Sequence, residues 1–360
     1  MARKRRMMIL TEGRLGIFTA KTATCLVRYC ADEVACILDS KAARAGKPLE
    51  ELIGVGAGLP IVSTVAEGLT HKPTQLVIGI APVGGALPAS WRKIILQCID
   101  AGMDVVSGLH HILGEDEEFA KAAKRRKVRI WDVRESPADV SVAQDRLRDL
   151  PQRRIALVGS DCNMGKMVTS VELDRGLRAA GYDSEFIATG QTGIMIAGSG
   201  IAIDHVISDF VNGAIEQLCW ERRKRQVVIV EGQGSVYHPA YSGVTVGMLH
   251  GSMPHAIVYQ HVPNRTHIYH YEKFPLMPVK AGIQLVEALT AAIYPSKVIA
   301  VSLNTFGMTD ADADRAAKKL EDETGLPAED PIRHGSAKLV RAAADALGLK
   351  PAQKRARASR

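Results

Sequence analysis

The stretch RIALVGSDCNMGKMVTS, residues 154–170, decides how the second half of the chain folds. Its first five residues, Arg154–Val158, predict a buried strand, and Met167–Ala180 has the spacing of a helix. Gly165 and Lys166 stand at the junction between them. A glycine-bearing loop between a strand and a helix points backbone N–H groups at an anion, and the helix dipole adds to the attraction. The stretch therefore predicts a phosphate-binding loop.

We expect the whole loop and the first turn of the helix to bind the phosphates of a cofactor. The predicted binding residues are Gly159, Ser160, Asp161, Cys162, Asn163, Met164, Gly165, Lys166, Met167, Val168 and Thr169. The spacing is one residue longer than that of the common P-loop, and Lys166 can reach a terminal phosphate. Met167 stands where most such loops place a serine or threonine that holds Mg²⁺, and a thioether is a poor ligand for a hard cation. Either Thr169 or Asp161 takes over that role, or the bound phosphate needs no metal.

A second motif, EGQGS at residues 231–235, follows the apolar run Val227–Val230. The run predicts a strand, and Glu231 at its carboxyl end either points at the phosphates or caps a turn. The loop and this motif resemble those of dethiobiotin synthetase-like P-loop enzymes, the loop at Gly159, Ser160, Asp161, Gly165 and Lys166. Those enzymes place an acidic residue of a similar motif beside magnesium. The resemblance implies that Asp161 and Glu231 would hold Mg²⁺ if this chain used ATP.

Histidines and tyrosines gather between residues 237 and 271, where six of the eleven histidines and five of the eight tyrosines lie. We interpret this segment as substrate-binding, because it is rich in loops and titratable groups and follows the EGQGS motif. Arg265 is the candidate for a substrate carboxylate, since a guanidinium matches a carboxylate with two hydrogen bonds. Tyr241 is a further substrate-binding candidate. His267 and His270 lack an H-E-x-x-H pattern, so we do not expect a metal site there.

Three residues are candidates for catalysis: His238, Glu231 and Lys166. His238 is the first candidate for a base that takes a proton from an amine, because the ordinary pKa of histidine lies near neutrality. Glu231 is the alternative base. Lys166 would place its positive charge on the phosphates.

The first half of the chain also alternates strands and helices. Its predicted strands are Met7–Leu10, Glu33–Leu38, Gln75–Ala81, Asp104–Leu109 and Val128–Val133, and its predicted helices are Ala20–Tyr29, Ser90–Ala101 and Asp116–Arg125. Continuous Val/Ile runs separated by helices predict a parallel sheet, in a Rossmann-like domain that lacks the G-x-G-x-x-G fingerprint. Ligands of such sheets bind beyond the carboxyl ends of the strands. Gly84, Gly85 and His110 follow two of these strands and are candidate substrate-binding residues.

The second half continues the same alternation after the phosphate loop. Its further predicted strands are Glu185–Ala188, Val227–Val230, Ile257–His261 and Val298–Leu303, and its further helices are Asp209–Arg222, Gly282–Ala292, Ala311–Thr324 and Ala337–Leu347. We therefore predict an α/β protein with two domains. The expected parts are a basic tail at 1–6, a Rossmann-like domain at 7–136, a connection at 137–153, a P-loop NTPase-like domain at 154–347 and a basic tail at 348–360.

The charge and the cysteines restrict the partners of the chain. The net charge is +7, and removing the nine positive charges of the two tails leaves −2 for the rest. The basicity therefore belongs to the tails, and we expect no nucleic-acid partner. No apolar run approaches the length of a membrane span, so we expect no membrane partner. The six cysteines form no C-x-x-C pair, which predicts neither a zinc site nor a disulfide framework and favours the cytoplasm.

Six motifs carry a resemblance that extends over nearly the whole chain, from about Arg6 to Leu347. They are GVGAGLPIV (54–62), IGIAPVGGALPASWR (78–92), DVVSGLHHIL (104–113), GSDCNMGKMVTS (159–170), EGQGS with HPAY (231–241) and SGVT (242–245). Together they resemble the bacterial DUF1611 family. The resemblance implies a Rossmann-like N-terminal domain, a P-loop C-terminal domain and a homo-oligomer. It also implies that some members acetylate the amino group of D-glutamate, or a similar acidic D-amino acid, with acetyl-CoA.

Three functions remain open on the sequence. The first is an N-acetyltransferase, whose loop holds the phosphates of acetyl-CoA while Arg265 orients an amino acid and His238 or Glu231 deprotonates it. Met167 favours this function, because acetyl transfer requires no magnesium. The second is a Mg-ATP-dependent ligase or kinase of the dethiobiotin synthetase type, in which Lys166 stabilises the transferred phosphoryl group. The third is a nucleotide-binding regulator without catalysis.

Overall fold

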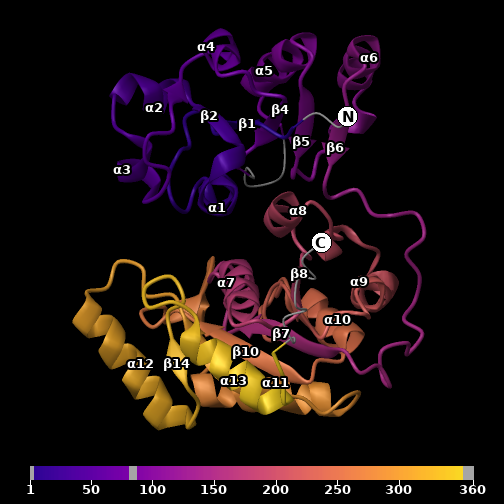
Figure 1. Ribbon diagram of the computed structural model, residues 1–360, viewed down its shortest axis with the longest axis vertical. Helices are drawn as coiled ribbons and strands as arrows, with labels where there is room; N and C mark the ends of the chain where they lie inside the picture. Colours follow the sequence, from indigo (N-terminus) through magenta and orange to yellow (C-terminus); the bar gives the residue numbers. More distant parts are fainter. Residues whose placement is uncertain (1–3, 81–86, 352–360) are drawn as a thin grey trace, which may run out of the picture. The chain divides into compact units, whose positions relative to one another are not determined.

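A computed structural model gives the fold for residues 4–80 and 87–351. Contacts within the chain divide it into two units. The first comprises the chain up to Glu135 together with Ile194–Gly198, and the second comprises Ser136–Gly193 and the chain from Ser199 onward. Each unit is built on a six-stranded sheet with helices packed beside it (Figure 1). The α/β class expected from the alternating pattern is confirmed.

The sheet of the first unit has the strand order β3-β2-β1-β4-β5-β6, and every neighbouring pair is parallel. Its strands are β1 (Met7–Leu10), β2 (Val34–Leu38), β3 (Ile61–Val62), β4 (Gln75–Ile78), β5 (Asp104–Ser107) and β6 (Ile130–Asp132). Its helices are α1 (Lys21–Tyr29), α2 (Ser40–Ala45), α3 (Leu49–Ile53), α4 (Val65–Thr70), α5 (Ala89–Asp100) and α6 (Glu117–Arg126). This order is that of Rossmann domains, so the predicted Rossmann-like architecture is confirmed.

One carboxylate of the first unit explains how it differs from dinucleotide-binding Rossmann domains. In those domains an acidic residue beyond the second strand binds the ribose of the cofactor. Here Asp39 follows β2 and is fully buried. It caps α2 by accepting the N–H groups of Lys41 and Ala42, and it also accepts the hydroxyl of Thr11 at 2.9 Å. The carboxylate is therefore used within the fold, in keeping with the missing glycine fingerprint.

The sheet of the second unit has the strand order β14-β13-β10-β7-β9-β8 and is also parallel throughout. Its strands are β7 (Arg153–Gly159), β8 (Ser184–Ile187), β9 (Val227–Val230), β10 (Ala256–His261), β13 (Lys297–Leu303) and β14 (Ala328–Glu329). The helices are α7 (Lys166–Ala179), α8 (Gln191–Ala197), which runs from the second unit into the first, α9 (Val211–Glu221), α10 (Ser242–Ser252), α11 (Val279–Ala291), α12 (Asp310–Thr324) and α13 (Ala337–Leu347). A separate antiparallel hairpin joins β11 (His267–Ile268) to β12 (Tyr271–Pro275).

β7 lies at the centre of this sheet, and its alternating side chains fill two cores. Ala156 and Val158 belong to one buried cluster, and Ile155 and Leu157 belong to the other, on the opposite face. Both faces are covered by helices, which explains why the strand reads as an unbroken apolar run. Since β9 and β10 flank β7 in parallel, the segments that follow all three strands meet at one edge of the sheet. This edge carries the phosphate loop.

The sequence did not reveal α10, which lies in the segment interpreted as rich in loops. The helix begins with five residues of low helix propensity, SGVTV, and two further glycines follow at 247 and 251. A Cβ at Gly247 would lie 2.7 Å from Val211, and a Cβ at Gly251 would lie 2.4 Å from the carbonyl oxygen of Asn212. The glycines therefore allow α10 to approach α9 closely, and tertiary packing outweighs the low helix propensity.

The other elements that the sequence did not reveal are short, and their local pattern is too brief to indicate them. They are α2, α3, α4, α8, β3, β11, β12, β14 and the 3₁₀ helices Ala31–Glu33, Leu113–Glu115, Ile203–His205 and Ser208–Phe210. The connection predicted at 137–153, which the structure describes in full, contains no helix or strand before β7 begins at Arg153.

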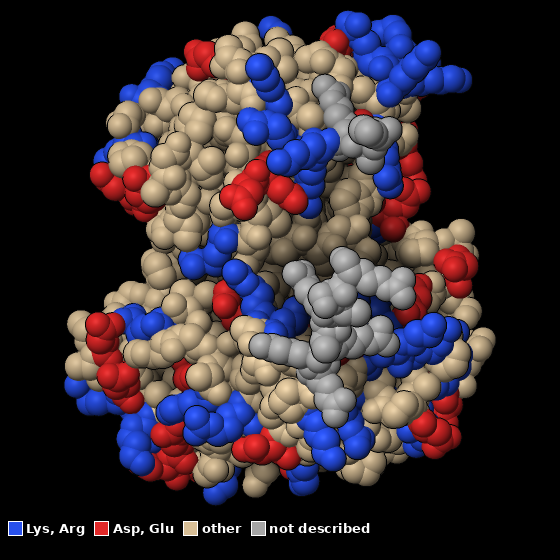
Figure 2. Space-filling view, in the orientation of Figure 1, with Lys and Arg blue, Asp and Glu red and all other residues tan. Residues whose placement is uncertain are grey.

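Charges of both signs are interspersed over the face shown in Figure 2, with a group of basic side chains over α6. The last turn of α6 contains Lys124, Arg125 and Arg126. Cations at this end of a helix interact favourably with the helix dipole, and both arginines also pair with Asp100. Helix stabilisation thus accounts for this group. No helix in the described part of the chain is long and apolar enough to cross a membrane.

Candidate functional site

The phosphate loop connects β7 to α7, as its sequence predicts. β7 ends at Gly159, and α7 begins after Gly165, whose φ of 108° lies in the left-handed region. A Cβ at Gly159 would lie 3.0 Å from the carbonyl oxygen of Gln260 on β10, so the absence of a side chain permits this close approach. Asn163 also has a positive φ, 51°, which asparagine tolerates. These positions wind the chain into a tight loop ahead of the helix.

Amide groups of this loop are open to a ligand. Within the part of the chain that the structure describes, no acceptor faces the N–H groups of Asn163, Met164, Gly165 or Met167. The N–H of Thr169 donates to the carbonyl of Gly165 at 3.0 Å and closes the first turn of the helix. Unpaired N–H groups at a helix N-terminus attract anions, and the dipole strengthens the attraction. The geometry fits the predicted phosphate site, and phosphate binding itself stays a prediction.

Lys166 lies across the loop and is nearly buried. Its Nζ donates to the carbonyl of Asp161 at 2.7 Å, and the residue is 5% exposed. Its stem packs against Gly232 of the EGQGS motif, where a Cβ would lie 2.7 Å from Lys166 Cδ and 2.0 Å from the carbonyl oxygen of Leu157. The second motif therefore supplies the surface on which the lysine rests. This contact explains why a glycine follows Glu231.

The carboxylate of Asp161 is fully buried and is occupied by donors of the protein. Oδ1 accepts the N–H of Cys162 at 2.7 Å. Oδ2 accepts the N–H of Tyr269 at 2.7 Å and Nη1 of Arg265 at 3.0 Å. Arg265, predicted to bind a substrate carboxylate, thus forms an ion pair with a carboxylate of the loop. Its role towards the substrate stays a prediction.

The positions that could replace the missing magnesium ligand are turned into the protein. Thr169 is 2% exposed, and its hydroxyl donates to Gln260 Oε1 at 2.6 Å and lies 2.9 Å from the hydroxyl of Ser302. Met167 offers only a thioether, and Asp161 is paired with Arg265. These residues do not fit the magnesium site of a P-loop.

Glu231 lies at the carboxyl end of β9, as predicted, and is 3% exposed. Its Oε2 accepts the N–H groups of Thr189 at 2.8 Å and Gly190 at 3.1 Å, and its carbonyl accepts the hydroxyl of Thr189 at 2.8 Å. The carboxylate therefore holds the segment after β8 against the end of β9. This is the turn-capping role, one of the two interpretations of Glu231, and a role at the phosphates stays a prediction.

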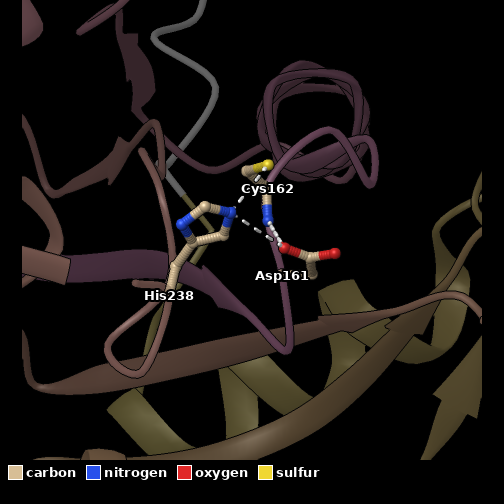
Figure 3. A group of neighbouring side chains, drawn as sticks. All are labelled: Asp161, Cys162 and His238. Carbon is tan, nitrogen blue, oxygen red and sulfur yellow. Dashed lines mark hydrogen bonds and ion pairs between the residues drawn. The ribbon is translucent and has the colours of Figure 1, made fainter. Parts of the chain in front are cut away.

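His238 lies beside the loop, with its ring buried against Asp161 and Cys162 (Figure 3). Its Nδ1 accepts the N–H of Ala240 at 3.1 Å, so the neutral ring carries its proton on Nε2. Nε2 lies 3.6 Å from Cys162 Sγ and 3.7 Å from Asp161 Oδ1. Burial lowers the pKa of His238, and the charge of Asp161 opposes that effect. In this tautomer His238 presents a donor to the loop, whereas a base at Nε2 requires the proton to lie on Nδ1.

Asp161, Cys162 and His238 also form a group of potential metal ligands. One ligand atom of each lies within 4.8 Å of the others. A histidine bound to zinc normally donates its second ring N–H to an acceptor, whereas Nδ1 of His238 receives an N–H from Ala240. Without a metal, burial and the charge of Asp161 raise the pKa of Cys162 to about 11. The donor set does not fit a zinc site in this arrangement.

Two aromatic rings pack against the ring of His238. Tyr241 stacks on the imidazole with 4.6 Å between ring centroids, and Tyr271 meets it edge-on at 5.3 Å. Tyr241, a predicted substrate-binding residue, is 53% exposed, so a ligand can reach part of its side chain. The structure brings His238, Tyr241 and the loop together, as the cluster in the sequence suggested.

Other predicted positions lie elsewhere or are turned away. The hydroxyl of Ser160 is buried and lies 2.9 Å from Nδ1 of His261, whose pKa burial lowers to about 4. His267 and His270 lie on the hairpin and its turn, where no helix brings their rings together. His110 follows β5 in the first unit and is exposed. Gly84 and Gly85 lie outside the described residues.

Two contributors to the site carried no clear signal in the sequence. Asn304 follows β13, and its Nδ2 donates to the carbonyl of Met164 at 3.2 Å. Tyr269 contributes its backbone N–H to Asp161, which no side-chain pattern can indicate. A polar residue directly after an apolar strand could have pointed to Asn304, because ligand sites of parallel sheets form at that edge.

Comparison with known proteins supplies the family. Residues 141–340 match the domain of unknown function described as the DUF1611_C P-loop domain, and residues 42–136 match the DUF1611_N Rossmann-like domain. A D-glutamate N-acetyltransferase of Tritonibacter scottomollicae is 36% identical over 295 residues, 81% of this chain and 88% of that protein. Another, of a Pseudoalteromonas species, is 36% identical over 278 residues, 77% of this chain and 83% of that protein.

A solved structure agrees with the fold. The crystal structure of a DUF1611 family protein from Anabaena variabilis has a TM-score of 0.90 and 36% identity, and it covers 95% of this chain and 99% of that one. Together with the order β3-β2-β1-β4-β5-β6 in the first unit and the loop between β7 and α7 in the second, these matches decide the assignment. The chain belongs to the DUF1611 family, with a Rossmann-like N-terminal domain and a P-loop C-terminal domain.

Proposed function

We propose that this protein is an N-acetyltransferase that acetylates the amino group of an acidic D-amino acid, such as D-glutamate, with acetyl-CoA. Support for the reaction comes from two relatives, named D-glutamate N-acetyltransferases, that are 36% identical over most of both chains. The observation that carries the cofactor assignment is a loop with unpaired N–H groups beside side chains that do not fit magnesium. Coenzyme A carries a diphosphate and a 3′-phosphate, and acetyl transfer from it needs no metal.

In this proposal the loop binds phosphate oxygens of the cofactor. The N–H groups of Asn163, Met164 and Gly165 donate to the phosphate, and Nζ of Lys166 moves to it from the carbonyl of Asp161. The Nε2–H of His238, which points at Cys162 and Asp161 of the loop (Figure 3), is a further donor in this proposal. Charge-assisted hydrogen bonds of this kind contribute about 1.5–3 kcal/mol each to binding.

Acetyl transfer requires the amino group of the substrate to lose a proton, so that its lone pair can attack the carbonyl carbon of the thioester. The carbon–sulfur bond then breaks, and coenzyme A leaves as a thiolate that takes up a proton. The pantetheine arm, a long chain with two amide bonds, separates the thioester from the diphosphate. With the arm extended, residues that touch the loop therefore contact the phosphates and lie far from the thioester. We assign Lys166 and His238 to cofactor binding on this ground.

The roles of Glu231 and His238 as bases can be separated by kinetics. A donor to phosphate affects the KM for acetyl-CoA, whereas a base affects kcat and its pH profile. We therefore expect Glu231→Gln to lower kcat if Glu231 is the base, while leaving the Kd for coenzyme A within twofold. An unchanged kcat for this variant would restrict Glu231 to holding Thr189 and Gly190.

The reaction is tested with purified protein, acetyl-CoA and either D-glutamate or L-glutamate, by following release of the coenzyme A thiol. We expect thiol release with D-glutamate and much less with L-glutamate. Absence of release with both, together with no binding of acetyl-CoA at millimolar concentration in titration calorimetry, would remove the proposal.

A thermal melt compares the cofactors directly. A ligand at one hundred times its Kd stabilises the folded protein by about 2.7 kcal/mol, which raises the midpoint by several degrees. We expect acetyl-CoA to raise the midpoint and Mg-ATP to leave it unchanged. The opposite result would favour the ATP-dependent ligase or kinase that the motifs resemble. Turnover of any amino acid would exclude a regulator without catalysis.

A further inference from the structure

Three consecutive carbonyl groups of the phosphate loop are held by side chains from the neighbouring strand ends. Nη1 of Arg265 donates to the carbonyl of Cys162 at 2.8 Å, and Nη2 donates to the carbonyl of Asn163 at 3.2 Å. Nδ2 of Asn304 donates to the carbonyl of Met164 at 3.2 Å. Arg265 follows β10 and Asn304 follows β13, so two of the three strands on this side of β7 contribute.

These bonds orient the N–H groups of the loop. No cis peptide bond occurs among the described residues, and in a trans peptide the C=O and the N–H point in opposite directions. Holding the carbonyls of Cys162, Asn163 and Met164 therefore turns the N–H groups of the next residues the other way. Those residues are Asn163, Met164 and Gly165, whose N–H groups have no acceptor among the residues that the structure describes. The two side chains thus orient three donors away from the carbonyl groups that they hold.

Both side chains are themselves fixed in place. Arg265 pairs with Asp161 at 3.0 Å and lies over the ring of Tyr269, 5.4 Å from its centroid. Oδ1 of Asn304 accepts the N–H of Phe306 at 3.1 Å, which assigns Nδ2 to the carbonyl of the loop. The backbone N–H of Asn304 donates to the carbonyl of His261 at 3.0 Å. Each side chain or its backbone is therefore held by contacts other than those with the loop carbonyls.

We propose that Arg265 and Asn304 are positioning residues that hold the loop open as a phosphate-binding nest. The inference deepens the proposed function and rests on its use of this loop for the cofactor phosphates. Neither residue contacts the phosphate in this role, and each acts through the carbonyl groups that it holds. We call Arg265 and Asn304 the clamp. Replacing either residue should lower the affinity of the loop for phosphate.

The test uses full-length variants Arg265→Lys and Asn304→Asp. Lysine keeps the charge beside Asp161 but cannot donate to two carbonyls and the carboxylate in one plane, and aspartate places an oxygen against the carbonyl of Met164. The matched control is Arg225→Lys, because Arg225 also makes two ion pairs, with Glu185 and Asp183, but stands at the amino end of β9. Melting temperatures of all variants verify that they fold.

The primary measurement is the Kd of inorganic pyrophosphate, with a chelator present to remove metal ions. We expect each clamp variant to weaken binding about tenfold, as the loss of one charge-assisted hydrogen bond predicts, and the control to bind as the wild type does. Unchanged Kd values in both folded clamp variants would overturn the proposal. A loss of folding in one variant leaves the other, together with Arg265→Gln, to decide.

A second measurement separates positioning from general damage to the fold. The KM for acetyl-CoA should rise about tenfold in the clamp variants, whereas the KM for S-acetylpantetheine, which has no phosphate, should stay within twofold. Equal changes in both values would indicate a merely structural role and contradict the clamp. If the wild type binds pyrophosphate but not acetyl-CoA, the proposed function fails while the clamp survives. If it binds neither, both fail.

Discussion

Replacing Gly232 by alanine should disturb β7 and the phosphate loop at once. A Cβ at this position would lie 2.0 Å from the carbonyl oxygen of Leu157 and 2.7 Å from Cδ of Lys166. Carbon–oxygen contacts seldom come closer than about 3.3 Å, so one of the two backbones must move by roughly 1 Å. Leu157 pairs with Val258 in the central part of the sheet and cannot shift alone. Since overpacking typically costs 1–3 kcal/mol, we expect a loss of about 3 kcal/mol in the free energy of unfolding.

The same substitution should also displace the stem of Lys166 and weaken pyrophosphate binding by about tenfold, through its charge-assisted contact. Urea unfolding followed by circular dichroism measures the stability, and titration calorimetry measures the binding. The control is Gly243→Ala in α10, where a Cβ would meet no atom within 4 Å. It should stabilise the helix by about 0.5–1 kcal/mol. A Gly232→Ala variant with the unfolding midpoint and the pyrophosphate affinity of the wild type would refute the close approach and the reasoning built on it.

Three further predictions concern metal, tautomer and pH. Adding Mg²⁺ or a chelator should change the Kd for coenzyme A by less than twofold, because the side chains around the loop do not fit the cation. Calorimetry that shows tenfold tighter binding with Mg²⁺ would contradict this expectation. His238→Gln, which keeps an N–H near the position of Nε2, should retain most of the coenzyme A affinity and the shape of the kcat pH profile, whereas loss of the acid limb of that profile would identify a base. Burial lowers the pKa of His255 and of His261 to about 4, below the ordinary value of 6.5, so between pH 6.5 and 4 the unfolded chain binds protons that the folded chain does not. The free energy of unfolding should therefore fall as the pH falls through this window. Glutamine at either position should reduce this pH dependence, measured by urea unfolding. A pH dependence equal to that of the wild type would count against the lowered pKa values of both histidines.

The loop could be predicted because its signal is local. The apolar run of β7, the glycine at the N-cap of α7 and the lysine after it lie within fourteen consecutive residues, Arg153–Lys166, and each belongs to one element or its cap. The Rossmann-like order of the first unit followed in the same way from alternating strands and helices. Such patterns depend on periodicity and turn chemistry, which a sequence displays directly.

The partners of the loop could not be predicted in the same way. Arg265 stands more than one hundred residues from Asp161 and Asn304 stands one hundred and forty residues from Met164, and both meet the loop only because β13 and β10 precede β7 in the sheet order. The sequence indicated that Arg265 is suited to a carboxylate. The fold supplies a carboxylate of the loop itself, Asp161, and turns the remaining bonds of the guanidinium to carbonyl groups.

By itself, the sequence determined the α/β class, the family and the place of the phosphate loop, because these depend on the residue types and spacing of short segments. It also showed that Met167 stands where most such loops place a magnesium ligand. The tertiary structure decided which groups each side chain meets. Thr169 and Asp161 satisfy protein donors and acceptors, His238 offers an N–H where a lone pair was expected, and Arg265 holds the loop backbone. Hydrogen bonds form only within about 3 Å, and that proximity follows from strand order and register, which bring together residues that are distant along the chain.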